Sequence, residues 1–422
     1  MGKKEILFML VPGSQMPNST SVAVSSQLTK GLQRSMNKFV GKRPNTPLTV
    51  TSLDAVQGKF WPSPNEEFLT ELLDVAKGAV EDFVDKKPYT GKKRPVVFSS
   101  REGLDIVIGL EEEEGKLKAV SLDVNPGGSS INVARALNNF GTPFELVGVY
   151  GSGLKGKLFA QLLEKEGIDT HGLFQVPEDT RIHLSTVANR NEYWLVSKSP
   201  KLSRDLLDQF TTQLIEACRK NEGEVLALAN QAPEGADANY MPEIIERTQG
   251  NHGMFTIYDT KLHSVERDEV ISVLEKSPGM IKPNLAEFAQ LTGIHENILR
   301  MDWDTIVHDA RLIIQHNGVN LVLISLDKDG AILVDKKRAA HASAPPIKVE
   351  SPGCAGDTGI AAMIDRTKKR DFDFRNLTDS QFKKVLSAFV AGGVATAAKP
   401  GSNLGTLEEV QKLERDVTVR FL

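Results

Sequence analysis

The sequence predicts an α/β protein built on a mostly parallel sheet. From residue 96 onward, short apolar segments alternate with helical stretches of roughly 10 to 20 residues, the pattern of repeated strand-helix-strand units. Two other stretches alternate polar and apolar residues around a central turn, as antiparallel ribbons do. A basic segment punctuated by proline and glycine, Lys86 to Pro95, precedes all of these. We therefore expect a main α/β domain over residues 96–422 and a separate segment over residues 1–95.

The strands expected in the main sheet are short and apolar, because helices cover both faces of a parallel sheet. They are Glu145 to Tyr150, Val225 to Ala229, Met254 to Tyr258, Met280 to Ile281 and Leu321 to Ser325. The two expected ribbons span Asp105 to Val124, which turns at Gly115, and Arg181 to Ser197, which turns at Asn189 to Asn191.

The first 95 residues predict an extra N-terminal α/β segment of unknown role. Expected strands lie at Glu5 to Val11 and Leu48 to Ser52, and expected helices at about Ser21 to Val40 and Asn65 to Asp85. The second helix has one broad apolar face that must be covered. We expect the main domain or a partner subunit to cover it; a regulatory ligand site is the alternative.

Charge and composition argue against several classes of partner. The chain has 51 basic and 55 acidic residues, and its net charge of −4 gives no overall attraction for nucleic acid or an anionic membrane. No apolar run reaches the ~20 residues that a bilayer-spanning helix needs. The two cysteines, Cys218 and Cys354, are far apart in sequence and predict no disulfide framework. We expect a cytoplasmic protein without a nucleic acid or membrane partner.

The most informative segment is Gly353-Cys354-Ala355-Gly356-Asp357-Thr358-Gly359. It lies between the strand-like Ile347 to Val349 and an apolar run that predicts a helix. Small residues at a helix start let backbone amides converge on an anion, and Asp357 beside them can accept a proton. Phosphoryl transfer to a hydroxyl needs both features. The alternative is a glycine-rich turn in which Asp357 is only the N-cap of the helix.

A second helix start with two glycines lies earlier, at Asn125 to Leu137. Adjacent Gly127 and Gly128 leave room for a ligand to touch the backbone. Asn132, one turn into the expected helix, carries an amide that can both donate and accept hydrogen bonds. This combination suits a ligand with several hydroxyl groups.

Together these two motifs resemble those of the ribokinase-like, or PfkB, carbohydrate kinases. PGGSSINVARAL followed by CAGDTG is similar to the phosphosugar branch of that family, which includes the minor bacterial phosphofructokinase, from about Val96 to the C-terminus. The resemblance implies a three-layer sandwich around a mostly parallel sheet, with a small β lid over about 104–124 and 181–198. It also implies an enzyme that uses ATP and Mg²⁺ and forms a homodimer through the lid.

The resemblance implies a role for each matching position at the sugar end. Asp357 is the expected base, and the amides of Cys354, Ala355 and Gly356 form the expected anion hole. The expected pocket for sugar hydroxyls comprises Asp105, Gly127, Gly128 and Asn132. Lys116 and Arg181 match positions that neutralise a phosphate already on the substrate; otherwise they are exposed cations on a hairpin.

At the nucleotide end, the resemblance rests on two further segments. Lys282-Pro283-Asn284 with Glu287 resembles the segment that orients water around magnesium, so Asn284 and Glu287 are expected to hold Mg²⁺ through water. The same pattern is also a capping box, and both interpretations can hold together. Ser325, Asp327 and Gly330 are the residues expected to meet ATP.

Four departures from the family pattern bear on activity and substrate. Cys354 and Asp327 each stand where a glycine is common, and Ser129 replaces a frequent lysine or glycine. Ala229-Asn230-Gln231-Ala232-Pro233 takes the place of Ser-Gly-Ser-Leu-Pro in the phosphosugar branch. The substrate is therefore the least certain part of the prediction.

In a third glycine-rich segment, Gly151 to Gly156 fits a dinucleotide fingerprint and Gly151 to Lys157 nearly fits a P-loop. Leu158 stands where a P-loop needs serine or threonine for magnesium. The resembled family has a strand-to-helix turn here without nucleotide contact. We therefore assign this segment no nucleotide.

The sequence as a whole predicts an ATP-dependent sugar kinase that acts on a ketohexose phosphate, with fructose 6-phosphate as the first candidate. Two alternatives stay open. One is a kinase for an unphosphorylated sugar or nucleoside, which the segment Ala229 to Ala232 permits. The other is a degenerate kinase that binds sugar or nucleotide and acts as a regulator.

Overall fold

The computed structural model describes residues 93–422, apart from residues 114–115, 189–190, 230 and 263–264. The side chains of residues 111–117 and 187–194 are also outside the description. The chain divides into two units, Met1–Thr90 and Gly91–Leu422, and only the second is described here. The elements expected before residue 93 lie outside the described residues, so they stay predictions.

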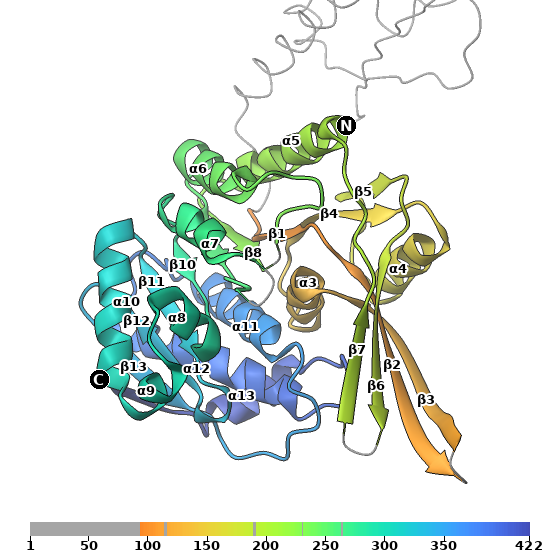
Figure 1. Cartoon of the computed structure of the whole chain (residues 1–422). Helices are drawn as coiled ribbons and strands as arrows, with labels where there is room; N and C mark the ends of the chain where they lie inside the picture. The colour runs from red at the N-terminus through yellow and green to blue at the C-terminus, as the bar shows by residue number, and fades with distance from the viewer. Residues whose placement is uncertain (1–92, 114–115, 189–190, 230, 263–264) are drawn as a thin grey trace, which may run out of the picture. The chain divides into compact units, whose positions relative to one another are not determined.

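A ten-stranded sheet forms the centre of the second unit (Figure 1). Its strands, in spatial order, are β14 (Thr418–Phe421), β13 (Ala339–Ser343), β12 (Ala331–Val334), β11 (Leu321–Ser325), β10 (Met280–Ile281), β9 (Phe255–Tyr258), β8 (Val225–Leu228), β1 (Val96–Ser99), β4 (Glu145–Gly151) and β5 (Leu173–Val176). Neighbours from β11 through to β5 pair in parallel, and β11 to β14 pair antiparallel.

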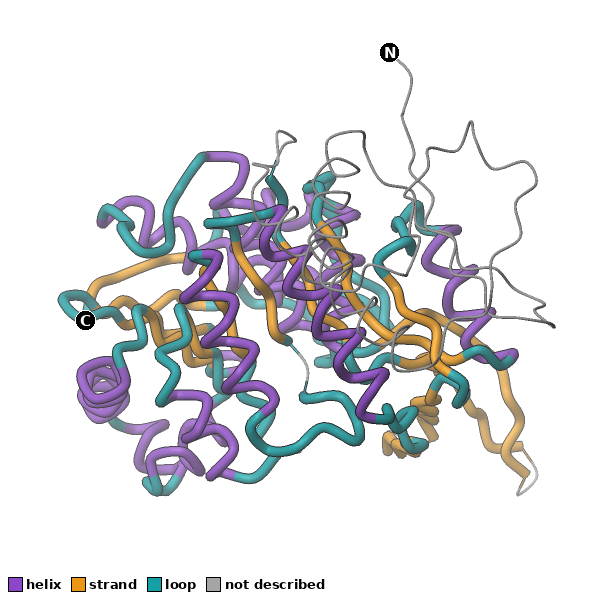
Figure 2. Tube along the Cα trace, turned by 90° about the horizontal axis from the view of Figure 1, so that it is seen from above, coloured by secondary structure: helices purple, strands orange, loops and turns teal. Residues whose placement is uncertain are grey.

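Helices cover both faces of this sheet and make a three-layer sandwich (Figure 2). One face carries α3 (Ser129–Asn139), α4 (Leu154–Lys165), α11 (Ala355–Arg370), α12 (Asp379–Ala397) and α13 (Leu407–Glu414). The other carries α5 (Arg204–Lys220), α6 (Tyr240–His252), α7 (Arg267–Leu274), α8 (Leu285–Thr292), α9 (Glu296–Met301) and α10 (Trp303–Asn317). None of these described helices is long and apolar enough to cross a membrane.

Strand β1 shows why the sheet strands are almost wholly apolar. Val97 belongs to the hydrophobic cluster on one face, whereas Val96 and Phe98 belong to the cluster on the other. All three side chains are fully buried. Successive residues of a strand point to opposite faces, so a strand between two helical layers needs apolar residues at every position.

Four strands form a second, smaller sheet that projects beside the main one as a lid (Figure 1). Its order is β3 (Lys116–Gly127), β2 (Gly103–Glu113), β6 (Arg181–Ala188) and β7 (Asn191–Val196). The β2–β3 and β6–β7 pairs are antiparallel, and β2 pairs in parallel with β6, which places Asp105 beside His183.

The predicted fold class is confirmed: the protein is an α/β sandwich with a mostly parallel sheet and a β lid. The five expected strands and both expected ribbons are present, with ends within three residues of the expected ones. One prediction is wrong, because Ile347 to Val349 forms a loop and not a strand. Pro345, Pro346 and Pro352 flank it, and proline cannot donate a hydrogen bond to a sheet ladder.

Candidate active site

The candidate site lies at the carboxyl ends of β9 and β10, where the helix α11 begins. Asp259 follows β9 and Lys282 follows β10, and the pairing of Tyr258 with Ile281 brings these two residues side by side. In parallel α/β sheets, ligands bind beyond the carboxyl ends of the strands. The chain thus places charged side chains at the edge where such a fold binds its ligands.

Asp357 is the third residue of α11 and is 6 % exposed. One of its oxygens, Oδ2, accepts a hydrogen bond of 3.0 Å from Nδ2 of Asn132 on α3. The interpretation of Asp357 as the helix N-cap is wrong, since Cys354 holds that position. The two motifs that are far apart in sequence therefore meet through this carboxylate and amide.

The start of α11 gathers positive charge of the kind that attracts an anion. The first amides of a helix have no partner within the helix, and they carry a partial positive charge. The ammonium group of Lys282 adds positive charge at the same place. Its Nζ lies 3.4 Å from the position that a Cβ on Gly356 would occupy. This helix start is formed by the residues predicted to make the anion hole, Cys354, Ala355 and Gly356.

Four charged side chains gather beside Asn132: Asp259, Lys261, Lys282 and Asp357. Asp259 lies between the two lysines, with its oxygens 2.7 Å from Nζ of Lys261 and 3.0 Å from Nζ of Lys282. Burial alone would raise the pKa of Asp259, but the two ammonium groups together hold it below its usual value. Asp259 therefore stays ionised and fixes both lysines.

Burial and neighbouring charges also act on the pKa of Asp357, but here burial has the larger effect. Its pKa is raised above the usual value because burial disfavours the carboxylate, and the nearby charge of Asp259 acts in the same direction. Lys261, 3.9 Å from Oδ1, is the strongest opposing influence, followed by the hydrogen bond from Asn132. A carboxylate with a raised pKa that is still paired with a cation is suited to accept a proton.

The predicted sugar-binding residues come together at the base of the lid. Asp105 is 9 % exposed, and its Oδ1 lies 2.9 Å from Nδ1 of His183. Its carboxylate lies directly over Gly127. A Cβ added to Gly127 would lie only 2.0 Å from Cγ of Asp105. Asn132 is close by and 4 % exposed, and its Oδ1 has no hydrogen-bond partner among the described residues.

Arg181 also lies at this end, in register with Gly103. Burial lowers the pKa of its guanidinium, whereas the carboxylates of Glu102 and Asp105 favour the charged form. Its buried Nε has no hydrogen-bond partner among the described residues. Glu102 is 2 % exposed and lies over Gly128, whose φ of 106° requires a glycine.

Lys116 is the one predicted substrate residue that cannot be placed in this site. It begins β3 at the far end of the lid, but its side chain lies outside the described residues. Its predicted contact with a substrate phosphate therefore stays a prediction.

A cavity of about 30 Å³ separates the lid from the start of α11. Its lining residues are Asp105, Ile106, Val107, His183, Ser185, Ser351, Gly353, Cys354, Gly401 and Ser402. This volume has room for one or two water molecules.

The predicted nucleotide residues meet on the other side of α11. Asn284 and Ser325 form a bridge between adjacent segments, and the Ser325 amide donates to the Pro283 carbonyl. Asn284 and Glu287 form a capping box at the start of α8, where Glu287 Oε2 also accepts from Thr260. Among the described residues, no group of three or more His, Cys, Asp or Glu side chains could hold a metal. The role of Asn284 and Glu287 in holding Mg²⁺ through water therefore stays a prediction.

The turn after β11 explains one departure from the family pattern. Asp327 has φ of 52°, a conformation that glycine adopts easily and other residues rarely. Its carboxylate is 69 % exposed and lies 3.1 Å from Nη2 of Arg300, so it is directed toward α9 and solvent. Gly330 closes the turn with φ of 92°, and a Cβ there would lie 1.9 Å from the Ala342 carbonyl oxygen.

In the segment that resembles a P-loop, backbone amides donate hydrogen bonds to other residues of the protein. The Gly151 amide donates to Oγ1 of Thr180, and the Gly156 amide donates to Oδ1 of Asp179. A Cβ on Gly156 would lie 1.8 Å from the Gly151 carbonyl oxygen. Close packing explains these glycines without a bound phosphate.

The altered segment from Ala229 to Pro233 packs against the base of the lid. Ser100 donates to the Gln231 carbonyl, and Nε of Arg101 donates to the Ala232 carbonyl over 2.5 Å. These contacts place the segment next to Glu102, on the sugar side of the site. Asn230 itself lies outside the described residues.

Comparison with known proteins agrees with this geometry. Residues 102–398 match the sequence model of the pfkB family of carbohydrate kinases. The chain belongs to this family. It is therefore a phosphotransferase with an alcohol group as acceptor, as the sequence predicts.

Curated relatives and solved structures of the family match at low identity. ATP-dependent 6-phosphofructokinase isozyme 2 of Escherichia coli is 24 % identical over 302 residues, which cover 71 % of this chain and 90 % of the relative. Tagatose-6-phosphate kinase of Staphylococcus epidermidis is 25 % identical over 270 residues, 62 % of this chain and 79 % of the relative. The structure of Escherichia coli phosphofructokinase-2 with potassium has a TM-score of 0.65 at 22 % identity, covering 77 % of this chain and 99 % of that one.

Sequence reasoning missed three residues of this pfkB kinase site. Asp259 and Lys261 follow a buried strand at the ligand-binding edge, and that position was the signal that could have revealed them. Glu102 gives no comparable signal, because its contact with Gly128 depends on the antiparallel pairing of β2 and β3, which sets Gly103 opposite Gly127. Lys282 was quoted only as part of a motif, without a role.

Cys354 generates a prediction about stability. Its φ of 61° is left-handed, which disfavours any residue with a Cβ. We expect Cys354→Gly to raise the free energy of unfolding above that of Cys354→Ala by about 0.5 to 1 kcal/mol, because both lose the thiol but only glycine relieves the backbone. Urea unfolding followed by circular dichroism measures the difference. Equal stability of the two variants would show that the backbone is not strained there.

Proposed function

We propose that this protein is an ATP-dependent kinase for a ketohexose phosphate, with fructose 6-phosphate as the first candidate. The observation that carries the proposal is the position of Asp357: a buried carboxylate, held by Asn132 and faced by Lys261, at a helix start that can bind an anion. The curated relatives are named for sugar phosphates, 6-phosphofructokinase and tagatose-6-phosphate kinase.

In the proposed reaction, the acceptor hydroxyl lies against Asp357. The hydroxyl oxygen attacks the γ-phosphorus of ATP while its proton passes to a carboxylate oxygen of Asp357. The bond between the γ-phosphorus and the bridging oxygen breaks, and ADP leaves with that oxygen. Such base assistance contributes on the order of a hundred- to ten-thousand-fold in rate.

The start of α11 and Lys282 hold the transferred group in this mechanism. The amides of Cys354, Ala355 and Gly356 point toward the charge that develops on the γ-phosphoryl oxygens, and the Lys282 ammonium lies beside Gly356. The nucleotide extends toward Ser325, Asp327 and Gly330. Asn284 and Glu287 would hold Mg²⁺ through water, and the ion would neutralise charge on the nucleotide phosphates.

Two unsatisfied polar atoms support a polyhydroxylated substrate at the base of the lid. Asn132 Oδ1 is an acceptor and Arg181 Nε is a donor, and both are buried without a partner among the described residues. Buried polar atoms are rarely left unpaired unless a ligand or water completes them. Asp105 adds acceptors for hydroxyl groups, and Arg181 and Lys116 are proposed to bind the phosphate of the sugar.

The alternatives differ in which of these features matter. The Ala229 to Pro233 segment lies on the sugar side, where its lost hydroxyl donors favour an unphosphorylated sugar or a nucleoside. A degenerate kinase would bind nucleotide without turnover. A panel of sugars, sugar phosphates and nucleosides with Mg-ATP separates the three, because only the proposed function predicts the highest kcat/KM for a ketohexose phosphate.

Asp357→Asn should lower kcat by about a hundredfold or more, because the amide cannot accept the hydroxyl proton. Nucleotide affinity should stay close to that of the wild type. Asp365→Asn, about two turns further along α11, is the matched control and should keep kcat. Turnover retained in a clean preparation of Asp357→Asn would remove this residue from the mechanism.

Arg181→Ala should raise KM for fructose 6-phosphate by about tenfold or more, because a charge-assisted hydrogen bond is lost. The KM for unphosphorylated fructose should change much less. Lys118→Ala, which removes an exposed lid cation, serves as the control. Equal effects on both sugars would favour a neutral sugar or nucleoside.

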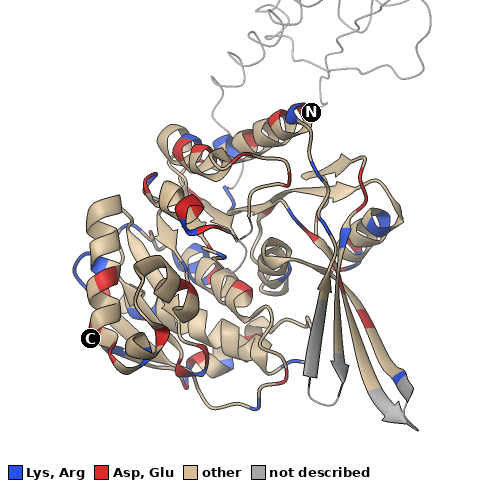
Figure 3. Ribbon diagram, in the orientation of Figure 1, with Lys and Arg blue, Asp and Glu red and all other residues tan. Residues whose placement is uncertain are grey.

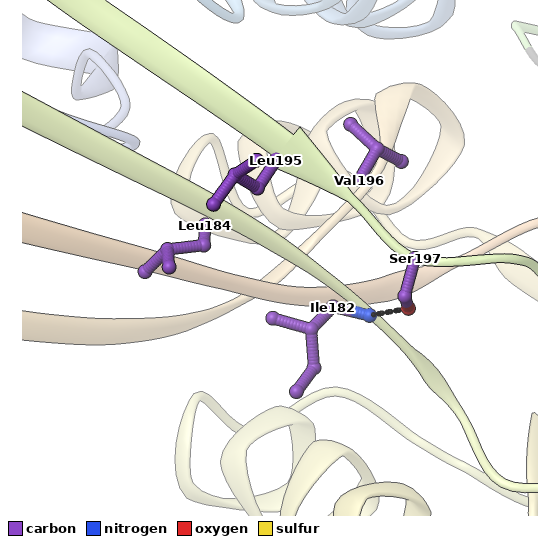
Figure 4. A pocket seen from close by; sticks show the side chains of 5 residues that line it. All are labelled: Ile182, Leu184, Leu195, Val196 and Ser197. Atoms are coloured by element: carbon purple, nitrogen blue, oxygen red, sulfur yellow. Dashed lines mark hydrogen bonds between the residues drawn. The ribbon is translucent and has the colours of Figure 1, made fainter.

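We also propose that the lid forms a homodimer contact. On its outer side, Ile182, Leu184, Leu195, Val196 and Ser197 line a groove of about 330 Å³ (Figure 4). Leu195 and Leu122 are each 64 % exposed. A second copy of the lid presents the same apolar residues and so can bury them symmetrically.

Leu195→Asp should convert the dimer to a monomer, because it places a charge in the proposed contact. Analytical ultracentrifugation of the full chain measures the change. Met301→Asp, at a residue that is 90 % exposed on α9, is the control and should leave the mass unchanged. A wild-type chain that sediments as a monomer, or an unchanged mass for Leu195→Asp, would contradict the contact.

A further inference from the structure

Lys261 is one of the charged residues of the site to which no motif assigned a role. It follows β9 by three residues, and its side chain is 19 % exposed. Its φ of 48° is left-handed, a conformation that residues with a side chain rarely keep without compensation. Its Nζ lies 2.7 Å from Asp259 and 3.9 Å from Asp357. The turn therefore holds this ammonium group between two buried carboxylates.

The two lysines of the cluster are not equivalent. Lys282 lies between Asp259 and the start of α11 at Gly356, where the transferred phosphoryl group is proposed to bind. Lys261 lies between Asp259 and the proposed base, on the other side of the same carboxylate. One lysine thus faces the anion, and the other faces the base.

The groups around Asp357 show which of them can keep it charged. Asp259, at the end of β9, repels its carboxylate, and Lys282, at the end of β10, attracts it less strongly than Lys261 does. Asn132 on α3 donates one hydrogen bond. The thiol of Cys354 has a pKa raised by burial and is neutral, and the charges facing that thiol are Asp105, Arg135, Lys261 and Asp357 itself. Lys261 is the main favourable charge.

We propose that Lys261 is a positioning residue that keeps the Asp357 carboxylate ionised and ready to accept the hydroxyl proton. This inference rests on the proposed function, since it assigns Lys261 to the same reaction. Lys261 acts through Asp357 and does not itself touch the reacting atoms. Asp259 completes the arrangement by anchoring the ammonium group at 2.7 Å.

A purely structural role for Lys261 predicts something different. If Lys261 only neutralised Asp259, its removal would lower stability and reduce activity by the same factor at every pH. If it keeps Asp357 ionised, its removal makes the carboxylate bind a proton more tightly. The base form is lost as pH falls through the pKa of Asp357, so the acid side of the activity profile would then move to higher pH.

The first test compares Lys261→Met, Lys261→Gln and Lys261→Arg in the full chain. The activity kcat/KM for fructose 6-phosphate is measured from pH 5.5 to 9 with saturating Mg-ATP. For both neutral variants we expect a loss at pH 6 that is about tenfold or more larger than the loss at pH 8.5, whereas Lys261→Arg keeps the wild-type profile. Losses that are equal at all pH values would overturn the proposal. So would failure of both neutral variants to fold.

The second test does not depend on activity. Aspartate labelled with ¹³C at the carboxyl carbon is incorporated into the wild type, Lys261→Met and Asp357→Asn, and the last variant assigns the Asp357 signal. We expect the titration midpoint of that signal to be higher in Lys261→Met than in the wild type. An unchanged midpoint would overturn the proposal.

The two tests keep the proposed function and the role of Lys261 apart. A wild-type chain that phosphorylates no sugar phosphate while the carboxyl midpoint still shifts would contradict the function and support the electrostatic pairing. An active wild type without a shift in either measurement would contradict only the role of Lys261.

Discussion

The proposed mechanism depends on one buried carboxylate, that of Asp357, which has to stay charged to accept a proton. Removing an ion from water costs several kcal/mol unless opposite charges and hydrogen bonds compensate. For Asp357 the compensation comes from the Asn132 amide at 3.0 Å, the Lys261 ammonium at 3.9 Å and the dipole of α11. Two acids and two lysines share this part of the site, so its charge is balanced before any ligand arrives. Elsewhere on the described unit, acidic and basic residues are intermingled on the helices (Figure 3).

The fold brings these groups together from distant parts of the chain. Helices α3 and α11 lie side by side on one face of the sheet, which places Asn132 against Asp357 (Figure 1). Parallel pairing of β9 with β10 aligns Asp259 and Lys282 at the same edge. The lid then carries Asp105 over Gly127, and a small cavity lies between the lid and the start of α11.

Much of this arrangement was predictable from local patterns. The apolar strands, the two ribbons and the glycines before Asn132 and Asp357 each leave a signal within a few residues, and motif order linked them to a kinase. Lys261 was missed although its position after a buried strand was a signal. Glu102 could not be found in this way, because its contact with Gly128 comes from the pairing of β2 with β3. Five described non-glycine residues have positive φ, and Cys354, Asp327 and Lys261 are three of them. Cys354 and Asp327 are also departures from the family pattern. Their positive φ explains why glycine is common at both positions.

The most direct test is a crystal structure of the full chain with ADP, Mg²⁺, aluminium fluoride and fructose 6-phosphate. The fluoride complex imitates the phosphoryl group in transfer. The account predicts an acceptor oxygen within about 3 Å of an Asp357 oxygen and the fluoride atoms against the amides at the start of α11. An Asp357 side chain turned away from the acceptor, with the fluoride bound elsewhere, would contradict it.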